Sequence, residues 1–335
     1  MQKVLISDPT LRDGSHAVRH QITLEHMLLY AELAEEVGIP ILEVGHGNGL
    51  GASSLQLGES LVSDTDMLAG CREKLINTKL GIHIIPGFAT LNKDLKNAID
   101  IGVDVVRVAS HCTEADITKR HIEYAREKGI EAFGVLMMSH MASLTKLLEE
   151  AKKMQSYGAQ SIIIMDSAGA YLPSDVSERI TLLVDELDIP VGFHAHNNLG
   201  MAIANSITAL ECGATILDGT TRGFGAGAGN AQLEILVAVL HKLGYKTGIN
   251  LYKLLDAADI AERQFLKIPY VSSTSIVSGL SGVFSGFAKP VERISKQLDV
   301  DPKDVFFELG RRKVVAGQED LILEVALSLS QKSGE

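Results

Sequence analysis

The sequence predicts an α/β protein, a (β/α)8 barrel followed by a small helical C-terminal domain. Short β-rich runs alternate with longer segments of helical periodicity, and eight such runs come before about residue 230. After Asn250 the strand signals fade. Repeated strand–helix units imply parallel strands with helices outside, and eight units suit a closed barrel. The alternative is a doubly wound open sheet, which would favour an early glycine-rich phosphate turn that this sequence lacks.

The expected strands are short and apolar: Val4–Ser7, Ile41–Gly45, Leu80–Ile85, Val103–Ala109, Glu131–Met137, Ser161–Met165, Val191–Ala195 and Thr215–Leu217. The expected helices between them are longer and amphipathic: Leu24–Val37, Asp94–Ile101, Thr118–Lys128, Leu144–Tyr157, Asp175–Leu187 and Ala202–Cys212. A glycine follows several of these helices, as Gly38 and Gly213 do. Glycine after a helix supplies the left-handed turn that ends it, so these positions support the predicted helix ends.

The segment Gly244–Asn250 marks a change in character and predicts a domain boundary. We expect a barrel domain over residues 1–248 and a helical domain over residues 249–335. The helices expected in the second domain are Leu251–Phe265, Pro290–Leu298, Asp304–Gly310 and Gln318–Ser330.

Composition narrows the class of protein. The chain has 335 residues, 46% of them hydrophobic, which is enough for a large core. Its net charge of -11 argues against a nucleic-acid or anionic-membrane binder. Three scattered cysteines indicate reduced thiols rather than a disulfide framework or a zinc cluster. The sequence has no signal-peptide pattern and no long apolar run, so we expect a soluble, cytoplasmic protein.

Candidate catalytic residues follow the expected strands, because barrel active sites form at the carboxyl ends of strands. The segment Thr10–His16 brings a cation, a carboxylate and an imidazole together directly after the first strand. At the end of the seventh strand, His194 and His196 are two residues apart and therefore point to one face. With Asp13 they form a facial set of two imidazoles and one carboxylate. Such a set suits a labile divalent ion, Mn²⁺ first, with Mg²⁺, Co²⁺ or Zn²⁺ as alternatives.

Other polar residues lie at expected strand ends. Glu43 and Arg107 are predicted to orient the metal and catalytic groups, and Asn230 is predicted to lie near the metal. Ser167 is predicted to contact substrate together with Arg12 and His194. The glycine-rich segment Gly223–Asn230 is either a ligand-binding loop or a flexible closing loop.

These motifs resemble those of the 4-hydroxy-2-oxovalerate aldolases, a family in the HMG-CoA-lyase-like superfamily of metal-dependent barrels. The resemblance covers nearly the whole chain, in the segments Asp8–Gln21, Glu43–Leu50, Arg107–Asp116, Gly192–Leu199, Gly225–Ala231, Glu308–Arg312 and Gly317–Asp320.

The resemblance implies retro-aldol cleavage of a 4-hydroxy-2-oxoacid to pyruvate and a short aldehyde, as in aromatic hydrocarbon catabolism. By position, Asp13, His194 and His196 would hold the metal, Arg12 would stabilise the pyruvate enolate and His16 would be the general base. A divalent ion and a guanidinium suit the charge that develops on the pyruvate oxygen, and an imidazole suits proton removal near neutral pH.

One position departs from the family pattern. Family members carry a tyrosine in the segment that matches Gly279–Phe287, and this chain has Phe284 there. Stereochemical control, aldehyde preference and reaction direction therefore stay open. The proton donor also stays open: it is either metal-bound water or another residue such as Tyr171 or Tyr270. Two other functions stay open as well. One is a Claisen-type condensing enzyme or acyl-CoA lyase of the same superfamily, and the other is a non-catalytic partner that stabilises a dehydrogenase.

The resemblance also implies a partner. Family members commonly pair with an acylating acetaldehyde dehydrogenase that receives the volatile aldehyde, so we expect such a partner and an oligomeric protein.

Overall fold

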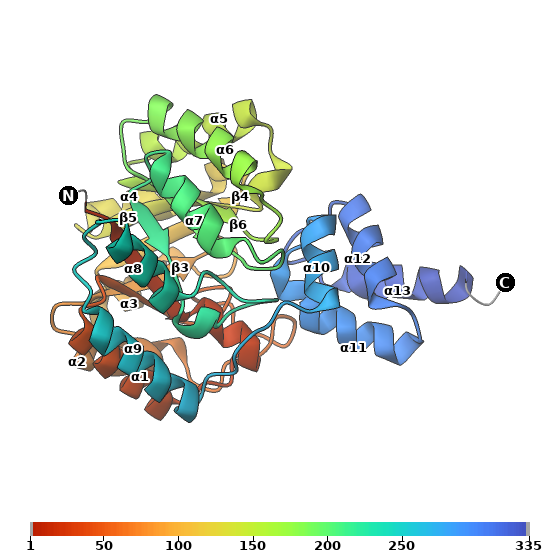
Figure 1. The fold of residues 1–335 in the computed structure, drawn as a ribbon, viewed down its shortest axis with the longest axis horizontal. Helices are drawn as coiled ribbons and strands as arrows, with labels where there is room; N and C mark the ends of the chain where they lie inside the picture. Colours follow the sequence, from red (N-terminus) through yellow and green to blue (C-terminus); the bar gives the residue numbers. More distant parts are fainter. Residues whose placement is uncertain (1–2, 333–335) are drawn as a thin grey trace.

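The structure, a computed structural model, describes residues 3–332 and confirms the predicted barrel. Eight parallel strands pair in chain order, and the last pairs with the first to close the barrel. Figure 1 shows helices packed around the strands. They are β1 (Leu5–Leu11), β2 (Ile41–Val44), β3 (Lys79–Ile84), β4 (Val105–His111), β5 (Glu131–Met137), β6 (Ser161–Asp166), β7 (Val191–Ala195) and β8 (Ile216–Asp218). The first strand continues past the predicted end at Ser7 to Leu11, so Thr10 belongs to the strand and not to the loop after it.

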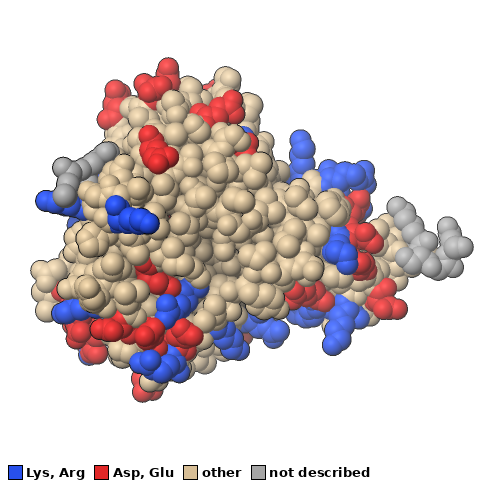
Figure 2. All heavy atoms as spheres, in the orientation of Figure 1, with Lys and Arg blue, Asp and Glu red and all other residues tan. Residues whose placement is uncertain are grey.

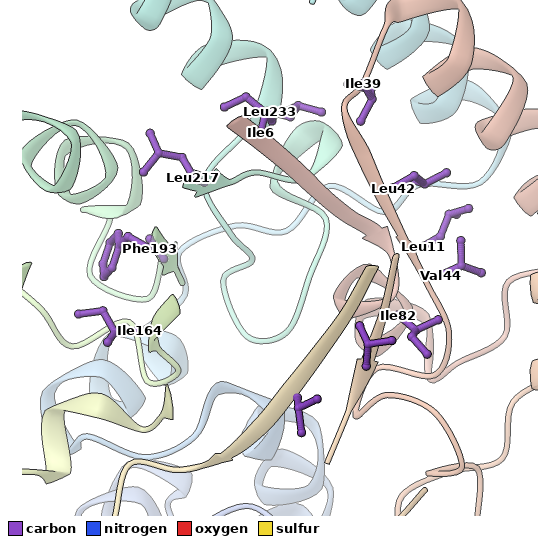
Figure 3. Close-up of a cluster of buried hydrophobic side chains, with 14 of the residues drawn as sticks. Ile6, Leu11, Ile39, Leu42, Val44, Ile82, Ile164, Phe193, Leu217 and Leu233 are labelled. Atoms are coloured by element: carbon purple, nitrogen blue, oxygen red, sulfur yellow. The ribbon is translucent and has the colours of Figure 1, made fainter. Parts of the chain in front are cut away.

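Each strand separates two apolar layers because its side chains alternate between its faces. On β2, Ile41 belongs to the core cluster inside the barrel, and Leu42 and Val44 belong to the cluster between strands and helices. Figure 3 shows part of the outer cluster, including Phe193 of β7. Glu43, between two outward-facing residues, is fully buried and points into the barrel.

Helices cover the outside of the barrel. They are α1 (Leu24–Val37), α2 (Asp64–Lys74), α3 (Lys96–Ile101), α4 (Lys119–Glu127), α5 (Leu144–Ser156), α6 (Pro173–Glu186), α7 (Ala202–Glu211), α8 (Leu233–Lys242) and α9 (Leu251–Gln264). Helices α2 and α8 were not predicted from the sequence. Helix α2 buries only Met67, Leu68 and Cys71, so its apolar stripe is narrow, and Ser63 caps its start by accepting from the Asp66 amide. Helix α8 is a nearly continuous apolar run, in which helical periodicity is hard to detect.

The C-terminal helices form a second body beside the mouth of the barrel (Figure 1). They are α10 (Ser273–Ser281), α11 (Ala288–Leu298), α12 (Pro302–Arg311) and α13 (Asp320–Lys332). Helix α10 was not predicted, because its serines and glycine resemble a loop. The Ser272 and Ser275 side chains form a capping box that begins it.

The predicted domain boundary at residues 248 and 249 precedes α9, but α9 packs on α1 and α8. Leu254 and Leu266 belong to the outer core of the barrel, whereas the core of the second body begins at Val277. We therefore propose that the boundary lies after α9, between Leu266 and Ser272.

Specific hydrogen bonds fix the second body on the barrel. The Ser285 amide donates to the Ser167 carbonyl (2.9 Å), and the Asn198 side chain donates to the Ser285 hydroxyl (3.0 Å). His140 contacts the Gly282 carbonyl through Nε2 (3.0 Å). Figure 2 shows a largely uncharged surface where the two bodies meet on this face. No helix in residues 3–332 has the length and apolar character that crossing a membrane requires.

Candidate active site

Three predicted metal ligands meet at the carboxyl end of the barrel. Asp13 follows β1, His194 lies on β7 and His196 follows β7. One ligand atom from each residue lies within 4.8 Å of the other two, and all three residues are buried. The ends of strands β1 and β7 bring these residues together although they are far apart in the sequence.

The free atoms of this cluster fit a divalent cation. Nε2 of His194 and Nδ1 of His196 are buried and have no hydrogen-bond partner among the described residues 3–332, which is rare for buried polar atoms. Asp13 accepts from Asn230 (2.6 Å) and from Arg12 (3.2 Å), so its carboxylate is held in one orientation. Burial lowers the pKa of His196 to about 3 and leaves a neutral imidazole. Burial alone would raise the pKa of Asp13, but His196 and Arg12 hold it well below its usual range.

A chain of buried ion pairs links the metal cluster to Arg12. His194 Nδ1 contacts Asp218 (2.8 Å), and Asp218 in turn accepts from Arg107 Nη2 (2.7 Å). Arg107 Nη1 also donates to Glu43, and Glu43 accepts from Arg12 Nε (2.9 Å). The contact with Asp218 leaves Nε2 as the free nitrogen of His194. Glu43 and Arg107 therefore lie between Arg12 and Asp218, and their role in orienting the metal and catalytic groups stays a prediction.

Asp218 was missed in the sequence because the predicted eighth strand stopped one residue short of it. We expect Asp218→Asn to weaken metal binding about 10–100-fold, because a carboxylate on the second ring nitrogen fixes the orientation and raises the basicity of a histidine ligand. Competition with a fluorescent chelator measures this affinity. Asp185→Asn, an exposed acidic position on α6, is the matched control. Unchanged affinity in Asp218→Asn would mean that Asp218 does not support His194 as a ligand.

Arg12 and His16 lie together against the backbone of Gly47. Arg12 Nη1 donates to the Gly47 carbonyl (3.2 Å), while Nη2 is buried and has no partner in the part of the chain that the structure describes. A Cβ at Gly47 would lie 2.5 Å from the His16 ring, so a larger residue at this position would displace the ring. Burial lowers the pKa of His16 below 6.5 despite the nearby Asp13 carboxylate. The result is an unprotonated imidazole held beside a guanidinium with one free donor.

These groups line a small inner cavity of about 80 Å³. Its polar wall holds Arg12, Asp13, His16, His83, Ser167, His194 and His196, and its apolar wall holds Ile85, Phe88, Met137, Met165 and Phe284. An outer cavity of about 510 Å³ opens between the barrel mouth and the C-terminal body, and His16 lines both. The inner cavity suits a small, partly polar molecule.

The C-terminal body places Phe284 in the wall of the inner cavity. Its ring lies edge-on to His16, with centroids 6.5 Å apart. The next residue, Ser285, bonds to Ser167, whose hydroxyl accepts from the Met138 amide (2.9 Å). Neither candidate proton donor lines this cavity: Tyr171 is buried and donates to Ser139 (2.8 Å), and Tyr270 lines the outer cavity.

The glycine-rich segment packs directly on the metal cluster. A Cβ at Gly225 would lie 2.7 Å from Asp13, and Asn230, at the end of this segment, donates to the same carboxylate. The Ala228 amide donates to Asn198 (3.0 Å). The segment therefore closes one side of the site through close backbone approach.

The chain matches two family models. The HMGL-like model covers residues 3–261, and the DmpG-like communication domain covers residues 269–331. A 4-hydroxy-2-oxovalerate aldolase of Pectobacterium atrosepticum is 62% identical over 99% of this chain and 97% of its own. The chain belongs to the 4-hydroxy-2-oxovalerate aldolase family. Its members include an aldolase of Spirochaeta aurantia, 64% identical over 98% of this chain and 97% of its own.

The gap between the two family matches coincides with the end of α9, where the core of the barrel ends. The same fold also occurs in a protein outside this aldolase family. The carboxyl transferase domain of Rhizobium etli pyruvate carboxylase superposes with a TM-score of 0.81 at 15% identity, covering 99% of this chain and 61% of that one.

Proposed function

We propose that this protein is a divalent-metal-dependent lyase that cleaves a 4-hydroxy-2-oxoacid, such as 4-hydroxy-2-oxovalerate, to pyruvate and a short aldehyde. One observation carries the proposal: Asp13, His194 and His196 line a single small cavity with Arg12 and His16, in a chain of the aldolase family. A cation for developing negative charge and a base for a hydroxyl proton are the two groups that this cleavage needs.

Asp13, His194 and His196 would hold the ion, and we propose Mn²⁺ because the set mixes imidazole nitrogen with carboxylate oxygen. Bound there, a divalent ion would supply positive charge beside the 2-oxo group. His16 takes the proton of the 4-hydroxyl. The C4 oxygen then becomes the aldehyde carbonyl, and the electron pair of the C3–C4 bond passes into the pyruvate enolate. Arg12 Nη2 is free to donate to the enolate oxygen. C3 takes a proton from water to complete pyruvate, and His16 releases to water the proton that it removed, so the two proton transfers balance.

Metal removal tests the proposal. We expect chelated protein to lose pyruvate release from 4-hydroxy-2-oxovalerate and to regain it with Mn²⁺. Lactate dehydrogenase with NADH detects the pyruvate, and parallel reloading with Mg²⁺, Co²⁺ and Zn²⁺ ranks the ions. Full turnover by protein shown to be free of metal would refute the metal-dependent reaction.

The absent tyrosine favours one other reaction, a Claisen-type condensation or acyl-CoA cleavage. Phe284 offers no hydroxyl to the inner cavity, where the family pattern has tyrosine. Turnover of acyl-CoA thioesters, measured beside turnover of the oxoacid on one preparation, distinguishes the two reactions.

The pKa of His16 predicts how cleavage depends on pH. Burial lowers this pKa, and Asp13 only partly offsets the shift. The imidazole is the active base when unprotonated, so kcat/KM should be level through pH 7 and fall only below the usual histidine pKa of about 6.5. A pH profile of pyruvate release measures this limb. A fall centred at pH 7 or above would contradict the assignment of His16 as the base.

We further propose that the C-terminal body binds an acylating acetaldehyde dehydrogenase and that the protein is oligomeric. The match of residues 269–331 to a communication domain supports this, as do exposed apolar residues on α10 and α12, including Leu280 and Phe307. Size-exclusion chromatography of the two proteins expressed together tests it. Separate elution at micromolar concentrations would contradict the partnership.

A further inference from the structure

His83 is a polar residue of the inner cavity that the proposed mechanism does not use. It lies on β3, in register with Arg107 on β4, and is 2% exposed. Its neighbours Ile82 and Ile84 belong to the apolar layer outside the barrel, so the alternation of the strand points His83 inward. It lines the same cavity as Arg12, His194 and Phe284.

Within residues 3–332, the His83 ring has a nitrogen without a hydrogen-bond partner. Its Nδ1 is buried and unpaired. Two other histidines beside the site differ: His20 contacts the Ser15 hydroxyl (2.9 Å), and His46 contacts the Gly58 carbonyl (3.0 Å) and accepts from the Asn48 amide (3.1 Å). The hydrogen bonds of those two rings connect loop segments to each other. An unpaired buried imidazole costs free energy unless a ligand pairs with it, so His83 is available to pair with a ligand.

The charges around His83 determine whether its ring is protonated and therefore which hydrogen bonds it can make. Burial lowers its pKa well below 6.5, and Arg12 and Arg107 lower it further, although Glu43 partly opposes them. The ring is therefore a neutral imidazole, with one nitrogen that donates and one that accepts. Arg12, one of these neighbours, also has an unpaired buried donor, Nη2. Two unpaired groups on one wall of a cavity match the oxygens of a small anionic ligand.

We propose that His83 is a substrate-contacting residue whose imidazole donates a hydrogen bond, beside Arg12, to an oxygen of the bound 4-hydroxy-2-oxoacid. This inference rests on the proposed function. A neutral imidazole can polarise a carbonyl or hold a developing oxyanion by donating its single N–H. The hydrogen bond strengthens as the oxygen gains charge, so it lowers the barrier to cleavage.

The experiment compares His83→Leu, which removes both ring nitrogens, with His83→Asn, which keeps a donor. We expect His83→Leu to lower kcat/KM for 4-hydroxy-2-oxovalerate about 10–100-fold, somewhat less than the loss of an oxyanion-hole donor. His83→Asn should recover most of that loss. His83→Leu also removes the proposed hydrogen bond to a bound ligand. Oxalate is an analogue of the pyruvate enolate, so its inhibition constant should rise in this variant. If the contact is to the 4-oxygen instead, the preference between the two enantiomers of 4-hydroxy-2-oxovalerate should change.

The controls separate this inference from the proposed function. His121→Leu makes the same change at a buried histidine on α4 that contacts the Ala89 carbonyl and does not line the inner cavity. Wild type and His121→Leu report whether the protein is an aldolase at all, and the metal content of His83→Leu reports whether His194 still binds. Should His83→Leu not fold, His83→Met, which also has no hydrogen-bond donor, takes its place. The inference is overturned if the variants match wild type within twofold in kcat/KM, oxalate inhibition and enantiomer preference, or if His83→Leu and His83→Asn are equally impaired.

Discussion

Arg12→Ala is expected to lower kcat for the cleavage of 4-hydroxy-2-oxovalerate by about 10³-fold, at the upper end of what the loss of one oxyanion-stabilising donor costs. Arg12 lines the inner cavity with a free Nη2, while its Nε is held by Glu43 and its Nη1 by Gly47. The guanidinium is therefore fixed before substrate arrives. Because negative charge on the enolate oxygen develops only as the C–C bond breaks, kcat should fall far more than KM rises. Steady-state pyruvate release measures both.

Arg12→Lys refines this result. Lysine keeps the charge but cannot hold Glu43 and Gly47 and also present a free donor, so we expect it to recover only a small part of the rate. Arg120→Ala, at an exposed arginine on α4, is the matched control and should match wild type. An Arg12→Ala variant that folds, binds metal and keeps kcat within fivefold of wild type would exclude Arg12 from enolate stabilisation.

The barrel was predictable because its signal is local and repeated eight times. Alternating strands and helices, each closed by a turn, specify parallel strands whatever the details of packing. The helices that were not predicted lack a clear local signal, each for a different reason. Helix α2 is mostly polar, α8 is mostly apolar, and α10 is rich in serine, so none shows a clear amphipathic period. The placement of α9 with the barrel depends on its contacts with α1, which no local pattern reveals.

The site was predictable where two residues share one strand end. His194 and His196 are two residues apart, and the carboxyl-end rule adds Asp13 from β1. Asp218 and His83 could not be assigned in this way. Asp218 matters because β8 pairs with β7 in the barrel, which places Asp218 beside His194. His83 matters because a nitrogen of its ring has no partner among the described residues, and the sequence alone does not show which buried polar atoms remain unpaired.

Arg107→Met is expected to lower the free energy of unfolding by about 3–5 kcal/mol, the cost of removing one partner from a buried ion pair. Arg107 is 1% exposed and lies between Glu43 and Asp218, both fully or almost fully buried. Burial alone would raise the pKa of Glu43, and Arg107 is the strongest of the charges that hold it below its usual range. Without the guanidinium, two carboxylates would face each other inside the barrel. Urea unfolding followed by circular dichroism measures the difference.

The dependence on pH distinguishes lost charge from lost packing in Arg107→Met. Without Arg107, burial would raise the pKa of Glu43 above its low value in the wild type, because only Arg12 would still pair with it. Lowering the pH then lets Glu43 take up a proton in the folded state, which relieves part of the cost. The gap in stability between wild type and variant should therefore shrink from pH 8 to pH 5, whereas a packing defect would keep it constant. Lys152→Met, which breaks an exposed ion pair with Glu186 (2.6 Å), should cost less than about 1 kcal/mol. If Arg107→Met is as stable as wild type, the ion pairs of Arg107 with Glu43 and Asp218 do not stabilise the barrel. Other contacts must then orient Arg12 and His194.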